Sequence, residues 1–178
     1  MKAIRYAVLG LVSVLMVSVA YSDNARTAEL FIDAFYSYDP ARLAGVMDAG
    51  VEGERMLYYQ AWAEAANYKI KKREPCATQG SFLVCRVTVT DDFGLALGYI
   101  ATDTFTLLIR KERVVSAKSE GDDPPIFMEL FEWISVNQPE VLTGPCLDMF
   151  EGGQTPGECA RSVAQAAKQF VKVRVPNE

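Results

Sequence analysis

The sequence predicts an α+β fold, in which helices pack on a curved antiparallel sheet and a further helix is added at the C-terminus. Apolar residues recur at helical spacing over residues 24–67, whereas polar and apolar residues alternate with a period of two over residues 68–119. The links between the alternating segments are too short for parallel crossovers, so the strands should form an antiparallel meander. Beyond Asp122, proline and capping residues mark two more helices.

The first 22 residues predict a signal peptide. Lys2 and Arg5 provide a basic start, residues 7–20 form an apolar run, and Ala20 and Ser22 are small residues at the positions that a signal peptidase recognises. An uncleaved membrane anchor is the alternative, but the apolar run is shorter than the roughly 20 residues that a bilayer requires. We therefore expect an exported protein, periplasmic or secreted, that is cleaved near Ser22 and then has no stable membrane anchor.

Three helices should precede the sheet. The first is expected over residues 24–38, and the second over residues 40–48, where Asp39 is placed to cap the helix and Pro40 to occupy its first turn. The third, over residues 52–67, has a broad apolar surface with an aromatic stripe. So broad a surface indicates that the third helix packs on more than one side.

The later elements follow from turns and prolines. Strands over residues 100–110 and 113–119 should be joined by a short polar turn at Lys111 and Glu112. Asp123, followed by two prolines, is placed to cap a helix that ends before Pro139. The last helix should begin at Pro156, with Thr155 and Glu158 as a capping box.

The four cysteines, 76, 85, 146 and 159, all follow the predicted signal peptide, and their even number fits two disulfides. A zinc site is the alternative, but such sites usually contain closely spaced cysteine pairs. A type II′ turn at Gly80 and Ser81 would place Cys76 opposite Cys85 in a non-hydrogen-bonded pair. The same register would place Arg73 opposite Thr88. We expect the disulfides Cys76–Cys85 and Cys146–Cys159.

Charge and composition exclude several classes of protein. The formal net charge of −5 becomes −7 once Lys2 and Arg5 leave with the signal peptide, so nucleic acid is not an expected partner. The basic residues of segment 69–73 form either a solvated strand face or a patch for an anionic partner. Histidine is absent, which excludes catalytic triads and histidine bases. No cofactor and no metal site are expected.

Three stretches, "TAELFIDAFYSYDPARLAGVMD", "ERMLYYQAWAEAANY" and "DTFTLLIRKERVVSAKSE", resemble the nuclear-transport-factor-2-like superfamily, in particular exported bacterial members of its SnoaL-like branch. The resemblance implies a cystatin-like cone over residues 23–139, with a pocket between sheet and helices. Residues 140–178 would then form an added disulfide-stapled loop and helix. The turn "RKER" departs from the Asp-Gly turn common in that superfamily. Its members include isomerases, dehydratases and cyclases as well as binding modules, so the fold does not settle the function.

Candidate site residues are drawn from the predicted pocket. The catalytic candidates are Asp103, Tyr58 and Glu64. The ligand-pocket candidates are Tyr36, Tyr59, Trp62, Tyr99 and Phe105. For the aromatic residues the alternative is ordinary core packing, and for Asp103 it is a solvated position at the end of a strand. Asp122 and Asp123 are interpreted as part of a helix cap in preference to a metal site.

Two functions remain open on this basis. The first is a non-catalytic module that binds a small apolar or amphipathic ligand, or a protein partner, with a homodimer through the sheet face as a further possibility. The alternative is a cofactor-free isomerase or lyase that uses an Asp/Tyr pocket. A cone filled by Trp62, Tyr58 and Phe105 would favour the first, and a cavity with a desolvated acid near a tyrosine hydroxyl would favour the second.

Overall fold

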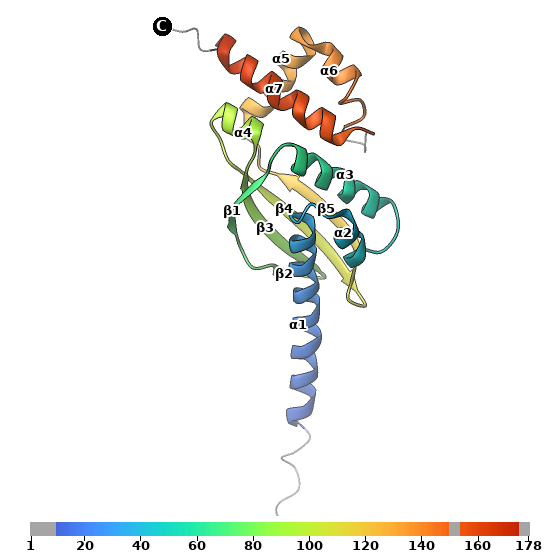
Figure 1. Cartoon of the computed structure of the whole chain (residues 1–178). Coiled ribbons are helices and arrows are strands. Elements are labelled where there is room, and N and C mark those ends of the chain that lie inside the picture. Colours follow the sequence, from blue (N-terminus) through green and yellow to red (C-terminus); the bar gives the residue numbers. More distant parts are fainter. Residues whose placement is uncertain (1–9, 150–153, 175–178) are drawn as a thin grey trace, which may run out of the picture.

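The computed structural model describes residues 10–149 and 154–174, with the backbone alone for residues 10–22 and for Val51. The fold is α+β: helices cover one face of a five-stranded antiparallel sheet, and further helices gather at one end of it (Figure 1). In the part of the chain that is described, no helix is both long and apolar enough to cross a membrane.

Three helices precede the sheet, as predicted. They are α1 (Gly10–Phe35), α2 (Pro40–Val46) and α3 (Val51–Ala65). Part of the predicted signal peptide, residues 1–9, lies outside the described residues, and from Gly10 onward its backbone is helical and continuous with α1. Cleavage near Ser22 stays a prediction.

The start of α2 is capped as the sequence predicted. The Asp39 carboxylate accepts hydrogen bonds from the backbone N–H groups of Ala41 and Arg42, at 2.9 and 3.2 Å. Pro40 occupies the first turn, where its missing N–H leaves no hydrogen bond unmade. The cap therefore satisfies donors that the helix itself cannot satisfy.

Asp39→Ala is expected to lower the free energy of unfolding by about 1 kcal/mol, because it leaves those two N–H groups without their acceptor. Urea unfolding followed by circular dichroism measures the change. Asp39→Asn is the matched control and should keep most of the stability, since asparagine caps helices about as well as aspartate. A loss of equal size in both variants would show that the carboxylate charge matters more than the cap.

The sheet contains five described strands. They are β1 (Lys69–Arg73), β2 (Ala77–Gln79), β3 (Phe82–Thr90), β4 (Ala101–Arg110) and β5 (Arg113–Gly121). Their order is β1-β3-β4-β5, and β2 pairs with the same side of β3 as β1. This arrangement agrees with the predicted antiparallel meander.

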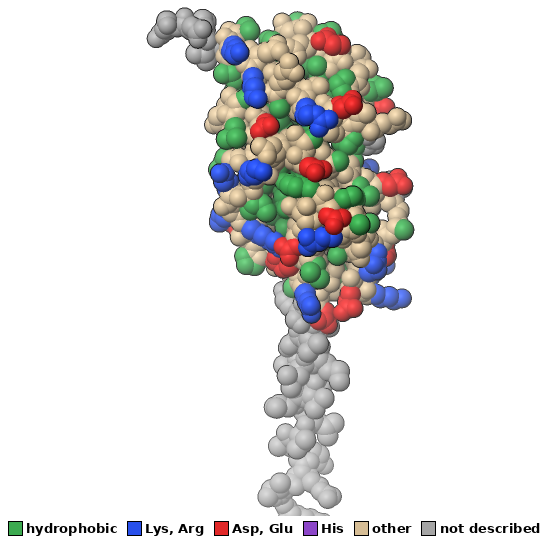
Figure 2. All heavy atoms as spheres, viewed as in Figure 1, with side chains coloured by type: hydrophobic (Ala, Val, Ile, Leu, Met, Phe, Trp, Pro, Cys, Tyr) green, Lys and Arg blue, Asp and Glu red, His purple; other side chains and the backbone are tan. Residues whose placement is uncertain are grey.

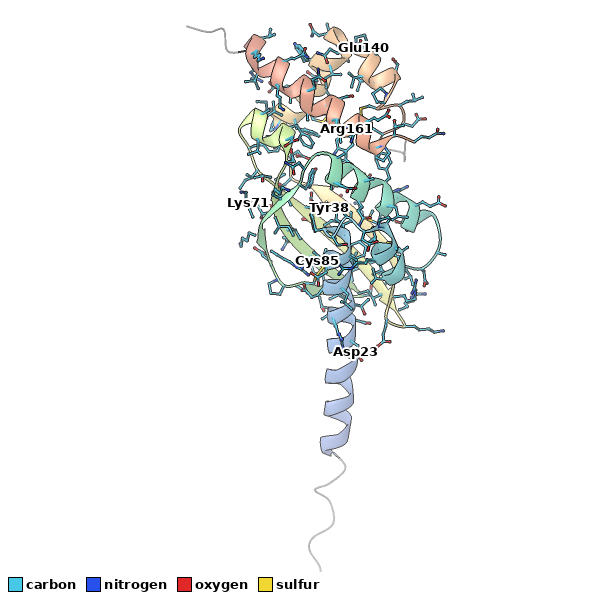
Figure 3. The ribbon with its side chains drawn as sticks, viewed as in Figure 1. Asp23, Tyr38, Lys71, Cys85, Glu140 and Arg161 are labelled. Atoms are coloured by element: carbon cyan, nitrogen blue, oxygen red, sulfur yellow. A yellow bond between two sulfur atoms is a disulfide. The ribbon has the colours of Figure 1, made fainter. Side chains whose placement is uncertain are left out.

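The hairpin next to Cys76 has the predicted register. Ala77 pairs with Val84, and Gly80 has the positive φ of 62° that its turn position requires. The structure contains a disulfide between Cys76 and Cys85, with their Cα atoms 4.2 Å apart. Cys85 lies on the inner strand face, in the interior of the molecule (Figure 3).

Beyond the cysteines, the predicted register is wrong. Arg73 pairs with Val87 instead of Thr88, and the ladder is irregular again between Ile70 and Lys72. The change of register turns the Arg73 guanidinium toward α1, where it forms ion pairs with Glu29 and Asp33, both at 2.5 Å. Arg73 therefore attaches the hairpin to the first helix and does not belong to a solvated basic face.

The remaining basic residues of this segment are solvated. Lys71 points away from the body of the molecule (Figure 3). Lys72 forms an ion pair with Glu74, at 2.7 Å, and both side chains are exposed. On the molecular face shown in Figure 2, Lys and Arg side chains are interspersed with Asp and Glu side chains.

The other helices are α4 (Asp92–Leu97), α5 (Pro125–Asn137), α6 (Pro139–Thr143) and α7 (Pro156–Arg174). Helices α4 and α6 were not predicted from the sequence. The prediction that Asp123 caps α5 is wrong, because Pro124 is the N-cap residue and makes no side-chain cap. The predicted capping box of α7 differs as well: the Thr155 hydroxyl donates to the Pro145 carbonyl oxygen.

The interior has two hydrophobic cores. The first lies between α1, α2 and the inner face of the sheet and includes Phe31, Leu43 and Phe105. The second lies between α3, α4, α5 and α7, and it contains the disulfide Cys146–Cys159, with Cα atoms 4.6 Å apart. The second core joins residues on both sides of the predicted boundary at residue 139.

Candidate functional site

A cavity of about 210 Å³ lies where the two cores meet. Its walls come from α1, α3, α4 and α5, from the inner face of β4 and β5, and from the segments next to them. The lining residues are Phe35, Tyr58, Tyr59, Trp62, Ala63, Tyr68, Phe93, Asp103, Ser119, Gly121, Asp123, Phe127, Phe131 and Met149. Most of them are aromatic, and none is Lys or Arg.

Helix α3 builds one wall of the cavity. Tyr58 and Trp62 lie four residues apart and Tyr59 lies next to them, so a broad helical surface presents all three to the cavity. The ring of Trp62 contacts that of Phe93, with centroids 6.1 Å apart in an edge-to-face arrangement. The ring centroid of Phe93 in turn lies 5.5 Å from that of Phe127 in α5. The aromatic wall thus continues from one helix to the next.

Asp103 is the acid on the inner face of the sheet. The period of two along β4 places it on the same face as Phe105, and it pairs with Val87 on one side and Gly121 on the other. Gly121 has no side chain to fill the space beside it. A Cβ atom at Gly121 would lie 4.0 Å from Asp103 Oδ1 and 2.8 Å from Asp123 Oδ2. Glycine therefore leaves room for both carboxylates at this end of the sheet.

The Asp103 carboxylate is hydrogen-bonded to Tyr36. The tyrosine hydroxyl, just beyond the end of α1, donates to Asp103 Oδ2 at 2.5 Å. The pKa of Asp103 is raised to about 7, mainly by burial; the Tyr36 hydrogen bond opposes the rise, and the charges of Asp123, Asp91 and Asp122 add to it. Asp103 can therefore gain or lose a proton near neutral pH.

Two other acids lie close to Asp103. Asp123 accepts a hydrogen bond from the Tyr99 hydroxyl, at 3.1 Å, and burial raises its pKa above the usual range. Asp91 caps α4 by accepting from the Gly94 N–H at 2.6 Å, and burial raises its pKa to about 6. Among the described residues, none of the three acids is in an ion pair.

The hydroxyls of Tyr36, Tyr68 and Tyr58 stay protonated at neutral pH. Burial is the main reason that the pKa of Tyr36 and that of Tyr68 are raised well above the usual value, and the charge of Asp103 adds to both shifts. Burial also raises the pKa of Tyr58 to about 12. These residues therefore act as hydrogen-bond donors and not as anions.

The structure brings together most of the candidate residues. Asp103, Tyr58, Tyr59 and Trp62 line the cavity. Tyr36 is hydrogen-bonded to Asp103, and Tyr99 to the cavity residue Asp123.

Two of the candidates do not belong to the site. Phe105 is fully buried in the first core, where its ring contacts Phe31, Phe35 and Tyr36. It therefore packs behind Tyr36 and does not line the cavity. Glu64 is exposed on α3 and is not among the lining residues, because its position turns it away from the aromatic stripe.

Several lining residues were not among the candidates. They are Phe35, Ala63, Tyr68, Phe93, Ser119, Gly121, Asp123, Phe127, Phe131 and Met149. Phe127 and Phe131 belong to the strongly apolar stripe of α5, which predicts burial but does not identify the partner of the helix. For Gly121 the available indication was a glycine at the end of a strand, which often marks a close approach.

Chemically, the site combines an apolar, aromatic wall with a carboxyl group that changes charge near neutral pH. Such a carboxyl can act as a proton acceptor or as a charged partner for a bound group. Within the described residues, no three His, Cys, Asp or Glu side chains are placed to hold a metal ion. No family model, curated protein or solved structure matches the chain.

Proposed function

We propose that this chain is an exported binding protein, and that its cavity holds one small, partly apolar ligand. The observation that carries the proposal is a cavity between two well-packed cores, with aromatic walls and a desolvated carboxyl group. An apolar pocket with a few polar groups is the usual form of a ligand site, and strongly shifted pKa values concentrate at such sites.

The cavity volume limits the ligand. At about 210 Å³ it is smaller than the pockets of several hundred Å³ that hold drug-sized molecules. An apolar cavity of about 150 Å³ is known to hold benzene. The proposed ligand is therefore about the size of one ring with a short substituent.

Fold and export belong to the same proposal. Three helices ahead of the sheet, packed on its inner face and leaving a cavity there, support the SnoaL-like, cystatin-like cone. The two disulfides and the signal-peptide features of the N-terminus support export. The outer sheet face, where the Thr88 and Thr102 hydroxyls lie 3.2 Å apart, is open to a second copy in a homodimer.

Filling the cavity should abolish binding. Ser119 lines the cavity, so Ser119→Leu puts a larger, apolar side chain into a site of limited volume. We expect isothermal titration calorimetry to detect binding of a small aromatic probe, 2-phenylethylamine or 2-phenylethanol, to the unmodified chain, and at least a tenfold loss in this variant.

The matched control for this experiment is Ser116→Leu. Ser116 lies on the same strand but pairs with Leu108, away from the cavity lining. This variant should bind the probes as the unmodified chain does. Equal affinities in both leucine variants would contradict the proposal that the cavity is the binding site.

The second candidate function is a cofactor-free isomerase or lyase with Asp103 as the base. It is favoured by the Asp103 carboxyl, whose pKa of about 7 suits proton abstraction at neutral pH. The Tyr36 hydroxyl, however, donates to Asp103 itself and is not free to stabilise a substrate oxygen. For this reason we place binding first.

Hydrogen exchange separates the two functions. Phenylacetone in heavy water should exchange the hydrogens beside its carbonyl faster in the presence of the chain if Asp103 is a base, as followed by proton NMR. The acceleration should then disappear in Asp103→Asn. If phenylacetone binds but its hydrogen exchange is not accelerated, the binding function stands and the isomerase function is rejected.

A further inference from the structure

We infer that the cavity selects small organic cations, namely an ammonium group attached to a single apolar ring or a short apolar chain. The inference rests on the proposed binding function and adds the chemical class of the ligand. It follows from three features of the described residues: aromatic side chains around the cavity, carboxylates in its wall, and the lack of any basic side chain among the residues that line it.

The aromatic lining suits a cation. The faces of aromatic rings have negative electrostatic potential, and ammonium groups bind to them most strongly when water is excluded. Trp62, Tyr59 and Tyr58 of α3 meet Phe93 and Phe127 around the cavity. Tryptophan provides the strongest contact of this kind, and Trp62 lines the cavity directly.

The charges of the wall have one sign. Asp103 and Asp123 line the cavity, and Asp91 is close enough for its charge to act on Asp103. Two arginines of the sheet are engaged elsewhere. Arg73 is paired with Glu29 and Asp33, and Arg113 with Asp48. In the part of the chain that is described, no Lys or Arg forms an ion pair with Asp103, Asp123 or Asp91, so a ligand that brings a cation relieves the mutual repulsion of these acids.

The two lining carboxylates are close enough for one ammonium group to be attracted by both charges. Asp103 Oδ1 and Asp123 Oδ2 lie 4.0 and 2.8 Å from the same point, the Cβ position of Gly121, so they are no more than 6.8 Å apart, the sum of the two distances. An ammonium N–H donates to a carboxylate over about 2.8 Å. A primary ammonium beside Gly121 can therefore donate to one of these oxygens and stay within reach of the charge of the other, while the rest of the ligand contacts the aromatic wall.

Other ligand charges fit less well. An anion would meet two like charges in the wall without a basic partner, which disfavours its binding. A neutral molecule can donate a hydrogen bond at best and brings no charge to balance the two carboxylates, and buried charges without a counter-charge are costly. The charges of the wall therefore disfavour both anionic and neutral ligands relative to cations.

The test compares three probes of nearly equal size. Binding of 2-phenylethylamine, 2-phenylethanol and phenylacetate to the full chain is measured by calorimetry at pH 8, where Asp103 is ionised and the amine still carries its proton. The amine should bind at least tenfold more tightly than the alcohol, and phenylacetate should bind more weakly than either.

Asp103→Asn should remove most of the preference, lowering amine affinity about tenfold and leaving alcohol affinity within twofold. Asp48→Asn is the matched control: it removes the same charge next to Arg113, at the opposite end of β5, and should change neither affinity. Trp62→Leu provides a second variant, which tests the preference without changing Asp103. It should lower the affinity for the amine more than the affinity for the alcohol.

The outcomes distinguish a failure of cation selection from a failure of the proposed binding function. If the alcohol or phenylacetate binds the unmodified chain as tightly as the amine, cation selection is wrong and the binding function stands. If the amine is preferred but Asp103→Asn and Trp62→Leu leave the preference unchanged, the assigned wall is wrong. If no probe binds the unmodified chain, the proposed function fails, and the inference fails with it.

Discussion

Asp103→Asn is expected to raise the free energy of unfolding at pH 8 by about 2 to 4 kcal/mol and to leave it nearly unchanged at pH 4. The pKa of Asp103 in the folded protein is about 7, well above its usual value of 3.8, and burial is the main cause. Between these two values the folded state holds a proton that the unfolded state has lost, so stability falls as the pH rises through this window. Each unit of pKa difference corresponds to about 1.4 kcal/mol.

Asparagine avoids this loss because it does not ionise. Its side-chain oxygen can still accept the hydrogen bond from Tyr36, so the local geometry is kept. Asp91 and Asp123, whose pKa values are also raised, change stability in the same direction in both proteins. The difference between the two pH profiles therefore isolates Asp103.

Urea unfolding at several pH values measures this effect. Asp48→Asn serves as the control, because it removes an equal charge at an exposed position far from the cavity. Asp48 pairs with Arg113 at the start of β5, and the strand is about 26 Å long from there to Gly121 at the cavity. It should show no gain at pH 8. If Asp103→Asn were no more stable than the unmodified chain at pH 8, the Asp103 carboxylate would be solvated, and the cavity would not hold a desolvated acid.

Replacing Cys146 and Cys159 by alanine is expected to lower the free energy of unfolding by about 3 kcal/mol and to weaken probe binding. The disulfide closes a loop of 13 residues, which restricts the unfolded chain. It also lies beside the cavity, since Met149 lines the cavity and its Sδ lies 3.7 Å from Cys159 Sγ. Without the bond, the wall that Met149 forms is no longer held to α7.

The hairpin disulfide is the matched comparison. Replacing Cys76 and Cys85 by alanine opens a loop of nine residues, so the loss of stability should be similar, at about 2.5 kcal/mol. No residue of β2 or of its turn lines the cavity, so probe binding should not change. Urea unfolding and calorimetry with 2-phenylethylamine measure both quantities. Equal losses of affinity in the two double variants would show that the second disulfide has no special relation to the cavity.

Elements that depend on local rules were predictable from the sequence. The cap at Asp39, the turn at Gly80 and the alternation along β4 each involve a few neighbouring residues, and the structure contains all three. The pairing of Cys76 with Cys85 followed from the turn, and Cys146 and Cys159 were the two cysteines that remained. The outer register failed because the ladder is irregular between Ile70 and Lys72, and periodicity alone does not reveal where a strand shifts.

The prediction that Asp123 caps α5 placed the start of the helix one residue too early. Asp39 precedes one proline and caps its helix, whereas Asp123 precedes two. The second proline, Pro125, occupies the first helical position, so Pro124 becomes the N-cap residue and the Asp123 carboxylate is left to accept from Tyr99. Helix α4 was missed for a different reason, since a helix of six residues is too short to show a helical period.

The site was predictable in part because α3 carries its aromatic stripe in one continuous segment. The rest of the wall comes from residues far apart in the sequence, such as Phe93, Phe127 and Met149, which tertiary packing brings together. The sequence left open whether Asp103 faces a pocket or water. That depends on Gly121 and on the helices that cover the end of the sheet, which no local pattern reveals.

A titration of the aspartate side-chain carboxyl carbons by NMR tests the central claim most directly, namely that the cavity holds a desolvated carboxyl group that pairs with a bound cation. In the free protein the Asp103 signal, assigned by its loss in Asp103→Asn, should titrate near pH 7. In the presence of 2-phenylethylamine its pKa should fall, because the ammonium stabilises the ionised form. An Asp103 signal that titrates near pH 4 in the free protein, or that does not respond to the amine, would contradict the account.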